Sequence, residues 1–324
     1  RTGVLGLAVV VVLMAWPGLF SGFQLDDYEQ NLILRGDGEF AEVGQPSWWN
    51  LFCFAEGSAK ENRARIDRGL LPWWSSERLR FNFLRPVSAA THWLDHQLWT
   101  GSPWAMHVHS LLWYLLVVFL CHRLYRRFTA APWVAALATV MFAVDDIHAI
   151  TVTWIANRNH LIACVLVLAA FACHVCWRLH GRASFDWTSC VLFLVALLAG
   201  EAAVAFGAFV VAWAVAIETD RSWRRRLLGI VPSLMTGFAW LMAYRAWGFG
   251  SRGSGGYVDP AGEPLSFLIA CLERIPAFLA SLSGASSSDL AYTFFDGPGR
   301  QILFFHHVLA TFLAAVVVVP FLRQ

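Results

Sequence analysis

The chain has 324 residues, of which 58% are hydrophobic and 14% charged, and its mean hydropathy is +0.54. These values exclude an ordinary soluble domain and place the chain in a lipid bilayer. The net charge of +2 excludes nucleic-acid binding, because no basic face large enough to neutralise several phosphates can form from it.

The first apolar run predicts a spanning helix from Gly3 to Phe23. It is longer than the apolar core of a signal peptide, and no small-residue cleavage pattern precedes Asp26. The sequence starts at Arg1 without a Met and stops at Gln324 directly after another apolar run. We therefore expect a fragment, from which any C-terminal domain is missing.

Residues 24–103 predict a long extracytoplasmic loop that lies on the membrane surface, because the segment is too polar to span and too aromatic to be disordered. It opens with the carboxylate pair Asp26-Asp27, which a spanning helix would hold at the depth of the lipid headgroups. The alternative is that this pair is only a polar stop that ends the span. Later in the loop, Pro86 to Trp99 predicts an interfacial amphipathic helix that Arg85 directly precedes.

The remaining spans are predicted within residues 104–324. Basic clusters follow the second and fourth spans, and a third occupies Glu218 to Arg226; the positive-inside rule predicts that all three face the cytoplasm. The acidic residues of the alternate loops then share the outer side. The predicted spans are about Met106–Cys121, Trp133–Val144, Leu161–Trp177, a re-entrant pair of short helices within Thr188–Ile217 that turns at Gly200, Leu227–Trp247 and Phe304–Leu322. The predicted fold is an all-α polytopic membrane helix bundle with about eight crossings.

Three further segments carry polar residues. Ser266–Ser283 holds Glu273 and Arg274 near its middle and predicts an interfacial helix. The glycine-rich stretch Gly248–Tyr257 predicts a flexible outer loop, because it lacks the Lys-Ser/Thr of a phosphate-binding loop. Glu201 interrupts an apolar run, so it either faces a polar cavity or cation or reaches the outer interface.

Several landmarks recur together in a fixed order along the chain. They are Asp26-Asp27, Arg85-Pro86, Asp95-His96-Gln97-Leu98-Trp99-Thr100-Gly101, Pro103, His107, Phe142-Ala143-Val144, Ile147-His148, Trp154-Ile155-Ala156-Asn157-Arg158-Asn159, Leu161, Glu201 and the stretch Arg245 to Tyr257. With this order the chain resembles membrane glycosyltransferases of the GT-C class. It looks most like the bacterial relatives of the transmembrane, tetratricopeptide-repeat-associated protein O-mannosyltransferases.

The chain departs from that pattern at a few positions. Asp145-Asp146 stands in place of the family's His-Pro, Ile150 in place of a Glu, Gly200 in place of a Lys, and Tyr114 in place of a His. The resemblance implies a GT-C-like fold and transfer of a sugar, with mannose as one candidate, from polyprenyl phosphate to an acceptor hydroxyl with inversion. It also implies a protein, glycan or lipid acceptor and a multi-pass protein of the bacterial inner membrane, with its active site facing the periplasm.

The implied chemistry assigns roles to particular residues. A general base is needed to take the proton of the acceptor hydroxyl, and Asp26 or Asp27 is the candidate, with Asp26 slightly favoured. The departing lipid phosphate needs cations or hydrogen-bond donors. Candidates for donor and phosphate binding are Arg85, His107, His148, Arg158, Glu201 and Arg245.

Each of these residues also has an alternative interpretation as a structural residue without a role in catalysis or binding. Arginines near a membrane surface also snorkel, and histidines there are often packed polar residues. Asp145 and Asp146, with His148, suggest an acceptor-binding or hard-metal cluster, or only a solvated turn. Whether a divalent cation, Mg²⁺ or Mn²⁺, takes part stays open.

Two other functions compete with the transferase. A lipid or solute carrier or flippase would use Glu201 and Arg245 as a gating pair in the membrane. An inactive relative of the enzyme is suggested by the departures at Asp145, Asp146, Ile150 and Gly200.

Overall fold

The computed structural model describes residues 2–36, 48–254, 257–260, 262–282 and 298–322. The chain divides into two compact units, Arg1–Gly253 and Ser254–Gln324. Both are mainly helical, which confirms the predicted helical class in its coarse form.

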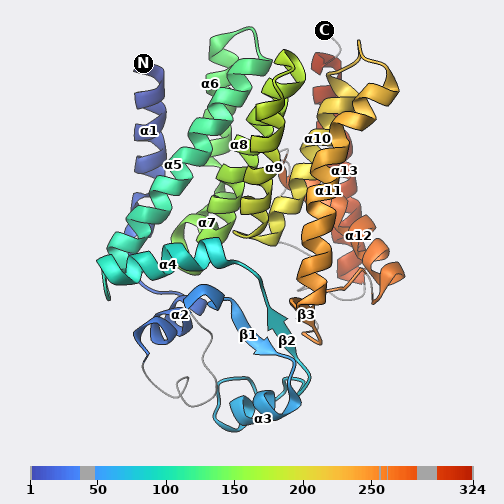
Figure 1. Cartoon of the computed structure of the whole chain (residues 1–324). Helices are drawn as coiled ribbons and strands as arrows, with labels where there is room; N and C mark the ends of the chain where they lie inside the picture. The colour runs from blue at the N-terminus through green and yellow to red at the C-terminus, as the bar shows by residue number, and fades with distance from the viewer. Residues whose placement is uncertain (1, 37–47, 255–256, 261, 283–297, 323–324) are drawn as a thin grey trace. The chain divides into compact units, whose positions relative to one another are not determined.

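The first unit contains a bundle whose helices run side by side (Figure 1). Prolines stand at the first helical positions of α5 and α6, where a missing N–H does no harm. The loops that follow α5, α8 and α10 carry the basic clusters and lie at the upper end in Figure 1, opposite α2. The bundle consists of α1 (Thr2–Ala15), α5 (Pro103–Phe128), α6 (Pro132–Val144), α8 (Arg158–His180), α9 (Ala183–Leu197), α10 (Phe206–Ala216) and α11 (Trp223–Ala246).

Four helical segments of the described chain are long and apolar enough to cross a membrane: Pro103–Phe128, Ile155–His180, Trp223–Ala246 and Pro264–Leu282. This length and composition fit a membrane protein. The five shorter apolar helices are Gly6–Phe20, Pro132–Val144, Ser184–Leu197, Glu201–Ala216 and Gln301–Leu313, so the count of about eight crossings stays a prediction.

Two predicted segments differ from the structure. The first apolar run does not form one continuous α-helix, because α1 ends at Ala15 before Pro17 and the chain continues as the 3-10 helix η1 (Trp16–Phe20). The segment predicted as interfacial, α12 (Pro264–Leu282), is among the four that qualify as spans, since Glu273 and Arg274 are its only charges.

The predicted break at Gly200 between two short helices is confirmed, whereas their re-entrant position in a membrane stays a prediction. The helix α9 ends at Leu197, and η6 (Glu201–Ala205) leads into α10. The Gly200 N–H donates to the Ala196 carbonyl at 3.0 Å. A Cβ on Gly200 would lie 3.2 Å from the Asn159 side chain, so a glycine allows close packing against α8.

Smaller elements gather at the lower end of the first unit (Figure 1). The predicted interfacial helix is present as α4 (Pro86–Leu98), and it is tied to the end of α9 because Ser88 Oγ donates to the Ala199 carbonyl at 2.7 Å. The other elements here are α2 (Asp26–Arg35), α3 (Ala59–Asp67), α7 (Ala149–Thr153), η3 (Trp48–Asn50), η4 (Asp146–His148) and η5 (Ile155–Asn157).

An antiparallel sheet, absent from the all-α prediction, also lies here. Its strands are β1 (Cys53–Glu56), β2 (Arg80–Asn82) and β3 (Gly250–Arg252), in the order β1-β2-β3. Phe81 pairs with Ala55 on one side and with Ser251 on the other. The prediction of a flexible loop for the whole glycine-rich stretch is therefore wrong at β3, because backbone pairing with β2 fixes that segment.

At the opposite end of the bundle, a buried ion pair joins α8 to the connection between α10 and α11. Arg178 Nε donates to Glu218 Oε1 at 2.5 Å, its NH2 group donates to Glu218 Oε2, and Trp213 Nε1 donates to the same carboxylate at 2.9 Å. The guanidinium lies against Gly229, where a Cβ would come within 2.5 Å of it. The glycine therefore makes room for the pair.

The described part of the second unit contains two helices, α12 and α13 (Pro298–Leu322). The last predicted span, Phe304–Leu322, lies within α13. The two helices pack together, and Thr311 Oγ1 donates to the Pro276 carbonyl at 3.0 Å.

Candidate functional site

The carboxylate pair Asp26-Asp27 forms the first two residues of the helix α2. The residue before it, Leu25, has φ +45° and ψ −119°, and among the described residues it is the only non-glycine residue with positive φ. Such a backbone costs about 1–3 kcal/mol and persists only where surrounding contacts impose it. The strained turn sets the direction in which Asp26 and Asp27 leave the first helix.

Asp27 is buried, and its carboxylate accepts hydrogen bonds from three backbone N–H groups. Its Oδ2 accepts from the backbone N–H of Gln24 at 2.9 Å and of Ile155 at 3.4 Å, and its Oδ1 accepts from Ala156 N–H at 2.6 Å. Burial raises the pKa of the Asp27 carboxyl to about 6, although these three hydrogen bonds and the charge of Arg158 lower it. The carboxylate thus ties α2 to η5.

Asp26 differs from its neighbour. It is half-buried, and no described residue forms a hydrogen bond or ion pair with its carboxylate. Burial raises its pKa, and the positive charge of Arg85 lowers it. Burial, together with the negative charge of Asp26, also raises the pKa of Glu29 to about 7, while Arg65 lowers it. Glu29 is a third acid of this site, and our sequence reasoning missed it.

Arg85, Glu201 and Tyr244 meet at the same end of the bundle. Arg85 Nε donates to Glu201 Oε2 at 2.7 Å, and the Tyr244 hydroxyl donates to Glu201 Oε1 at 3.1 Å. The Arg85 guanidinium lies over the rings of Phe83 and Phe52, 4.4 and 5.1 Å from their centroids. Glu201 therefore has a cationic partner, which agrees with the prediction that it faces a polar cavity or a cation. That partner is Arg85, whereas the carrier hypothesis pairs Glu201 with Arg245.

The terminal nitrogens of Arg85 are the open part of this group. No described residue hydrogen-bonds to them, and the Arg85 side chain is 17% exposed. They form the two-pronged face with which a guanidinium binds a phosphate or carboxylate. Glu201 thus fixes Nε of Arg85, and the two terminal nitrogens remain able to donate hydrogen bonds to a ligand.

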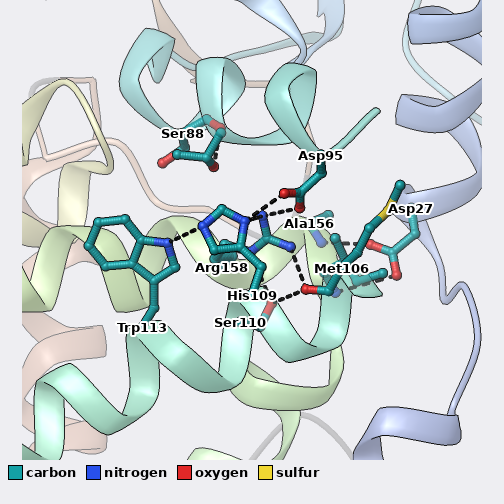
Figure 2. Close-up of polar contacts among 11 residues, drawn as sticks. Asp27, Ser88, Asp95, Met106, His109, Ser110, Trp113, Ala156 and Arg158 are labelled. Atoms are coloured by element: carbon teal, nitrogen blue, oxygen red, sulfur yellow. Dashed lines mark hydrogen bonds and ion pairs between the residues drawn. The ribbon is translucent and has the colours of Figure 1, made fainter. Parts of the chain in front are cut away.

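Arg158 is not available for a phosphate. Its side chain is fully buried, and its NH1 donates to Asp95 Oδ2 at 2.5 Å, its Nε to Ser110 Oγ at 2.9 Å and its NH2 to the Met106 carbonyl at 2.8 Å. Figure 2 shows this network between α4, α5 and the start of α8. The prediction that Arg158 contacts the lipid phosphate is therefore wrong, because its charge is used inside the protein.

His109 completes the network and has a definable tautomer (Figure 2). Trp113 Nε1 donates to His109 Nε2 at 3.0 Å, and an indole N–H is a donor only. His109 Nε2 is therefore the acceptor, so its Nδ1 carries the proton that it donates to Asp95 Oδ1 at 2.6 Å. Asp95 consequently receives donors on both oxygens.

The predicted histidines lie in packed environments. His107 is buried, and its Nε2 lies 2.8 Å from the Gly22 carbonyl, which can only accept, so this nitrogen donates. His148 lies against the rings of Phe142 and Tyr114, with centroids 4.5 and 5.6 Å away. Burial lowers its pKa, and the charge of Asp145 raises it. Both histidines thus match the packed-residue alternative.

The remaining predicted site residues lie apart or outside the described side chains. Asp145 Oδ1 accepts from Ile147 N–H at 3.2 Å, as in a local turn, and the side chain of Asp146 lies outside the described residues. Arg245 is exposed in the last turn of α11, directly after Tyr244. Among the described residues, no three His, Cys, Asp or Glu side chains come together as a metal site.

Comparison with known proteins leaves the chain without a match. No protein-family model matches it, and neither does any curated protein or solved structure.

Proposed function

We propose that this protein is a membrane glycosyltransferase of the GT-C class, similar to bacterial protein O-mannosyltransferases. It transfers a sugar from a polyprenyl-phosphate donor to a hydroxyl of a protein, glycan or lipid on the extracytoplasmic side of a bacterial inner membrane. The observation that carries this proposal is the ion pair of Arg85 with Glu201, at the end of the bundle opposite the basic clusters. Asp26 lies near enough for the positive charge of Arg85 to lower its pKa.

Asp26 is the proposed general base. Its carboxylate has no hydrogen-bond partner among the described residues, so its lone pairs are open to an acceptor hydroxyl. Asp27 already accepts three backbone N–H groups. It is therefore a positioning residue, which holds α2 against η5 and keeps its neighbour in place.

Arg85 is the proposed phosphate contact. Its open fork matches the oxygens of a lipid phosphate, and Glu201 fixes the direction of the fork through Nε. As the bond between the anomeric carbon and the phosphate oxygen breaks, its electron pair stays on that oxygen, and the guanidinium stabilises the added charge. The acceptor oxygen bonds to the anomeric carbon from the opposite face of the sugar, so the configuration at that carbon is inverted. The proton of the acceptor hydroxyl goes to the Asp26 carboxylate.

A transfer assay on membranes tests this proposal. Membranes that contain the full chain are given polyprenyl-phosphate mannose and a panel of hydroxyl acceptors, and the anomeric configuration of the product is determined. We expect transfer with inversion, and Arg85→Lys should slow it by about 10- to 100-fold, because one ammonium replaces a two-pronged contact. Exposed Arg63→Lys is the matched control. No transfer to any acceptor, or equal rates for both variants, would count against the proposal.

A further inference from the structure

A small pocket lies between α2 and α4, and the apolar side chains of Phe23, Leu34, Met106 and Ile155 form part of its lining. Asp27, Gln30 and Asn31 line it from α2, and His92 and His96 line it from α4. The pocket is open on one side, and it has room for about one water molecule, which is the space that a single hydroxyl group needs. Its two histidines stand four residues apart, on the same face of α4.

Several polar atoms of the residues that line this pocket have no hydrogen-bond partner among the described residues. Gln30 Nε2, Asn31 Oδ1, His92 Nε2 and His96 Nδ1 are buried and have no hydrogen-bond partner. Gln30, His92 and His96 are only 3%, 4% and 8% exposed. A buried polar group left without a partner costs about 1–3 kcal/mol. Four such atoms on residues that line one pocket therefore indicate a site that suits a polar ligand.

The types of these atoms define the ligand chemistry. Gln30 Nε2 can only donate a hydrogen bond, and Asn31 Oδ1 can only accept one. A metal ion cannot accept from the amide N–H, and a deprotonated anion cannot donate to the amide oxygen. Burial lowers the pKa of His92 and of His96, so both imidazoles are neutral and each offers a donor or an acceptor. A hydroxyl group donates one hydrogen bond and accepts up to two, so it can pair with both amide atoms and with one of the two imidazoles.

We propose that this α2–α4 pocket binds an aliphatic hydroxyl group of the substrate, carried either by the acceptor or by the sugar of the donor. The inference rests on the proposed function. It extends that function, because Asp27 lines the pocket and Asp26 is the proposed base, so the bound hydroxyl orients a substrate beside the reacting centre. Gln30 and His92 are then specificity-determining residues.

Binding to the purified, detergent-solubilised full chain tests the pocket without turnover. The donor probe is polyprenyl-phosphate mannose, compared with deoxymannose analogues that each lack one hydroxyl. The acceptor probe is a peptide rich in Ser and Thr, compared with its Ala counterpart. Gln30→Met and His92→Phe remove the polar atoms at similar size, and exposed Gln97→Met on α4 is the matched control.

We expect both pocket variants to weaken binding of one probe by about 10-fold, while Gln97→Met leaves it unchanged. The loss should vanish for the analogue without the hydroxyl, and the affected probe identifies the source of the group. Unchanged affinity for both probes in variants that still fold, or no binding of either probe by the wild type, would overturn the pocket and leave it as a water site. Hydroxyl-dependent binding without any sugar transfer would support the hydroxyl-binding pocket and contradict the proposed transferase function. Sugar transfer by variants whose binding is unaffected would support the transferase function and contradict the pocket.

Discussion

Replacing Asp95 by Ala tests the buried network that connects α4, α5 and α8. The side chains of Asp95 and Arg158 are 1% and 0% exposed. The substitution leaves the guanidinium inside the protein without its counter-ion, and His109 Nδ1 loses its acceptor as well. Arg158 is removed from water in the folded state but hydrated in the unfolded state, so the substitution destabilises only the folded state and lowers the free energy of unfolding.

The size of the effect follows from these contacts. Removing one partner of a buried ion pair costs about 3–5 kcal/mol. Arg158 keeps its bonds to Ser110 and to the Met106 carbonyl, so we expect a value near the lower end, about 3 kcal/mol. The double variant Asp95→Leu, Arg158→Met removes both charges and should recover much of the loss.

The free energy of unfolding in detergent is the measurement, by denaturant titration of the wild type and each variant. Asp67→Ala is the matched control, because this exposed acid pairs with Arg63 only on the surface and its loss should cost less than about 1 kcal/mol. If Asp95→Ala is no more destabilising than Asp67→Ala, or if the double variant is worse than the single one, the reasoning about this buried pair is wrong.

Two further outcomes are expected from the same kind of measurement. The pKa of Asp27 is raised to about 6 and that of Glu29 to about 7, so the folded protein binds protons that the unfolded chain has lost, and its stability should fall as the pH rises from about 4 to 7. Asp27→Asn and Glu29→Gln should each flatten this decline, and an unchanged slope in both would contradict it. Gly229→Ala should destabilise the protein by about 1–3 kcal/mol through the displaced Arg178 ion pair, whereas Gly237→Ala, whose Cβ would meet its nearest neighbour at 3.4 Å, serves as the control that should change little.

Apolar runs predicted most of the helices, because a long stretch of apolar residues has few other stable forms in a bilayer. The turn at Gly200 was also predictable, since one helix from Thr188 to Ile217 would be too long for the membrane. The sheet was not. Each of its strands has only three or four residues, and β3 lies about 170 residues after β2 in the chain, so no local pattern reports their pairing.

The site was predictable only in part. An acid such as Glu201 within an apolar run signals that a cationic partner is needed, but the sequence does not say which arginine supplies it. From the sequence, Arg85 and Arg158 both suit a phosphate, yet Arg158 forms a buried ion pair with Asp95 of α4. Likewise, adjacent carboxylates look equivalent in a sequence, and only the backbone around η5 distinguishes Asp27 from Asp26.

The initial rate of sugar transfer by Asp26→Asn, compared with wild type and Asp27→Asn in the same membranes, tests the central claim most directly. We expect Asp26→Asn to lose about 10²- to 10⁴-fold in rate, because the acceptor hydroxyl loses its general base. Asp27→Asn should mainly lower the stability and retain more of the rate per folded molecule. Undiminished transfer by Asp26→Asn would contradict the account.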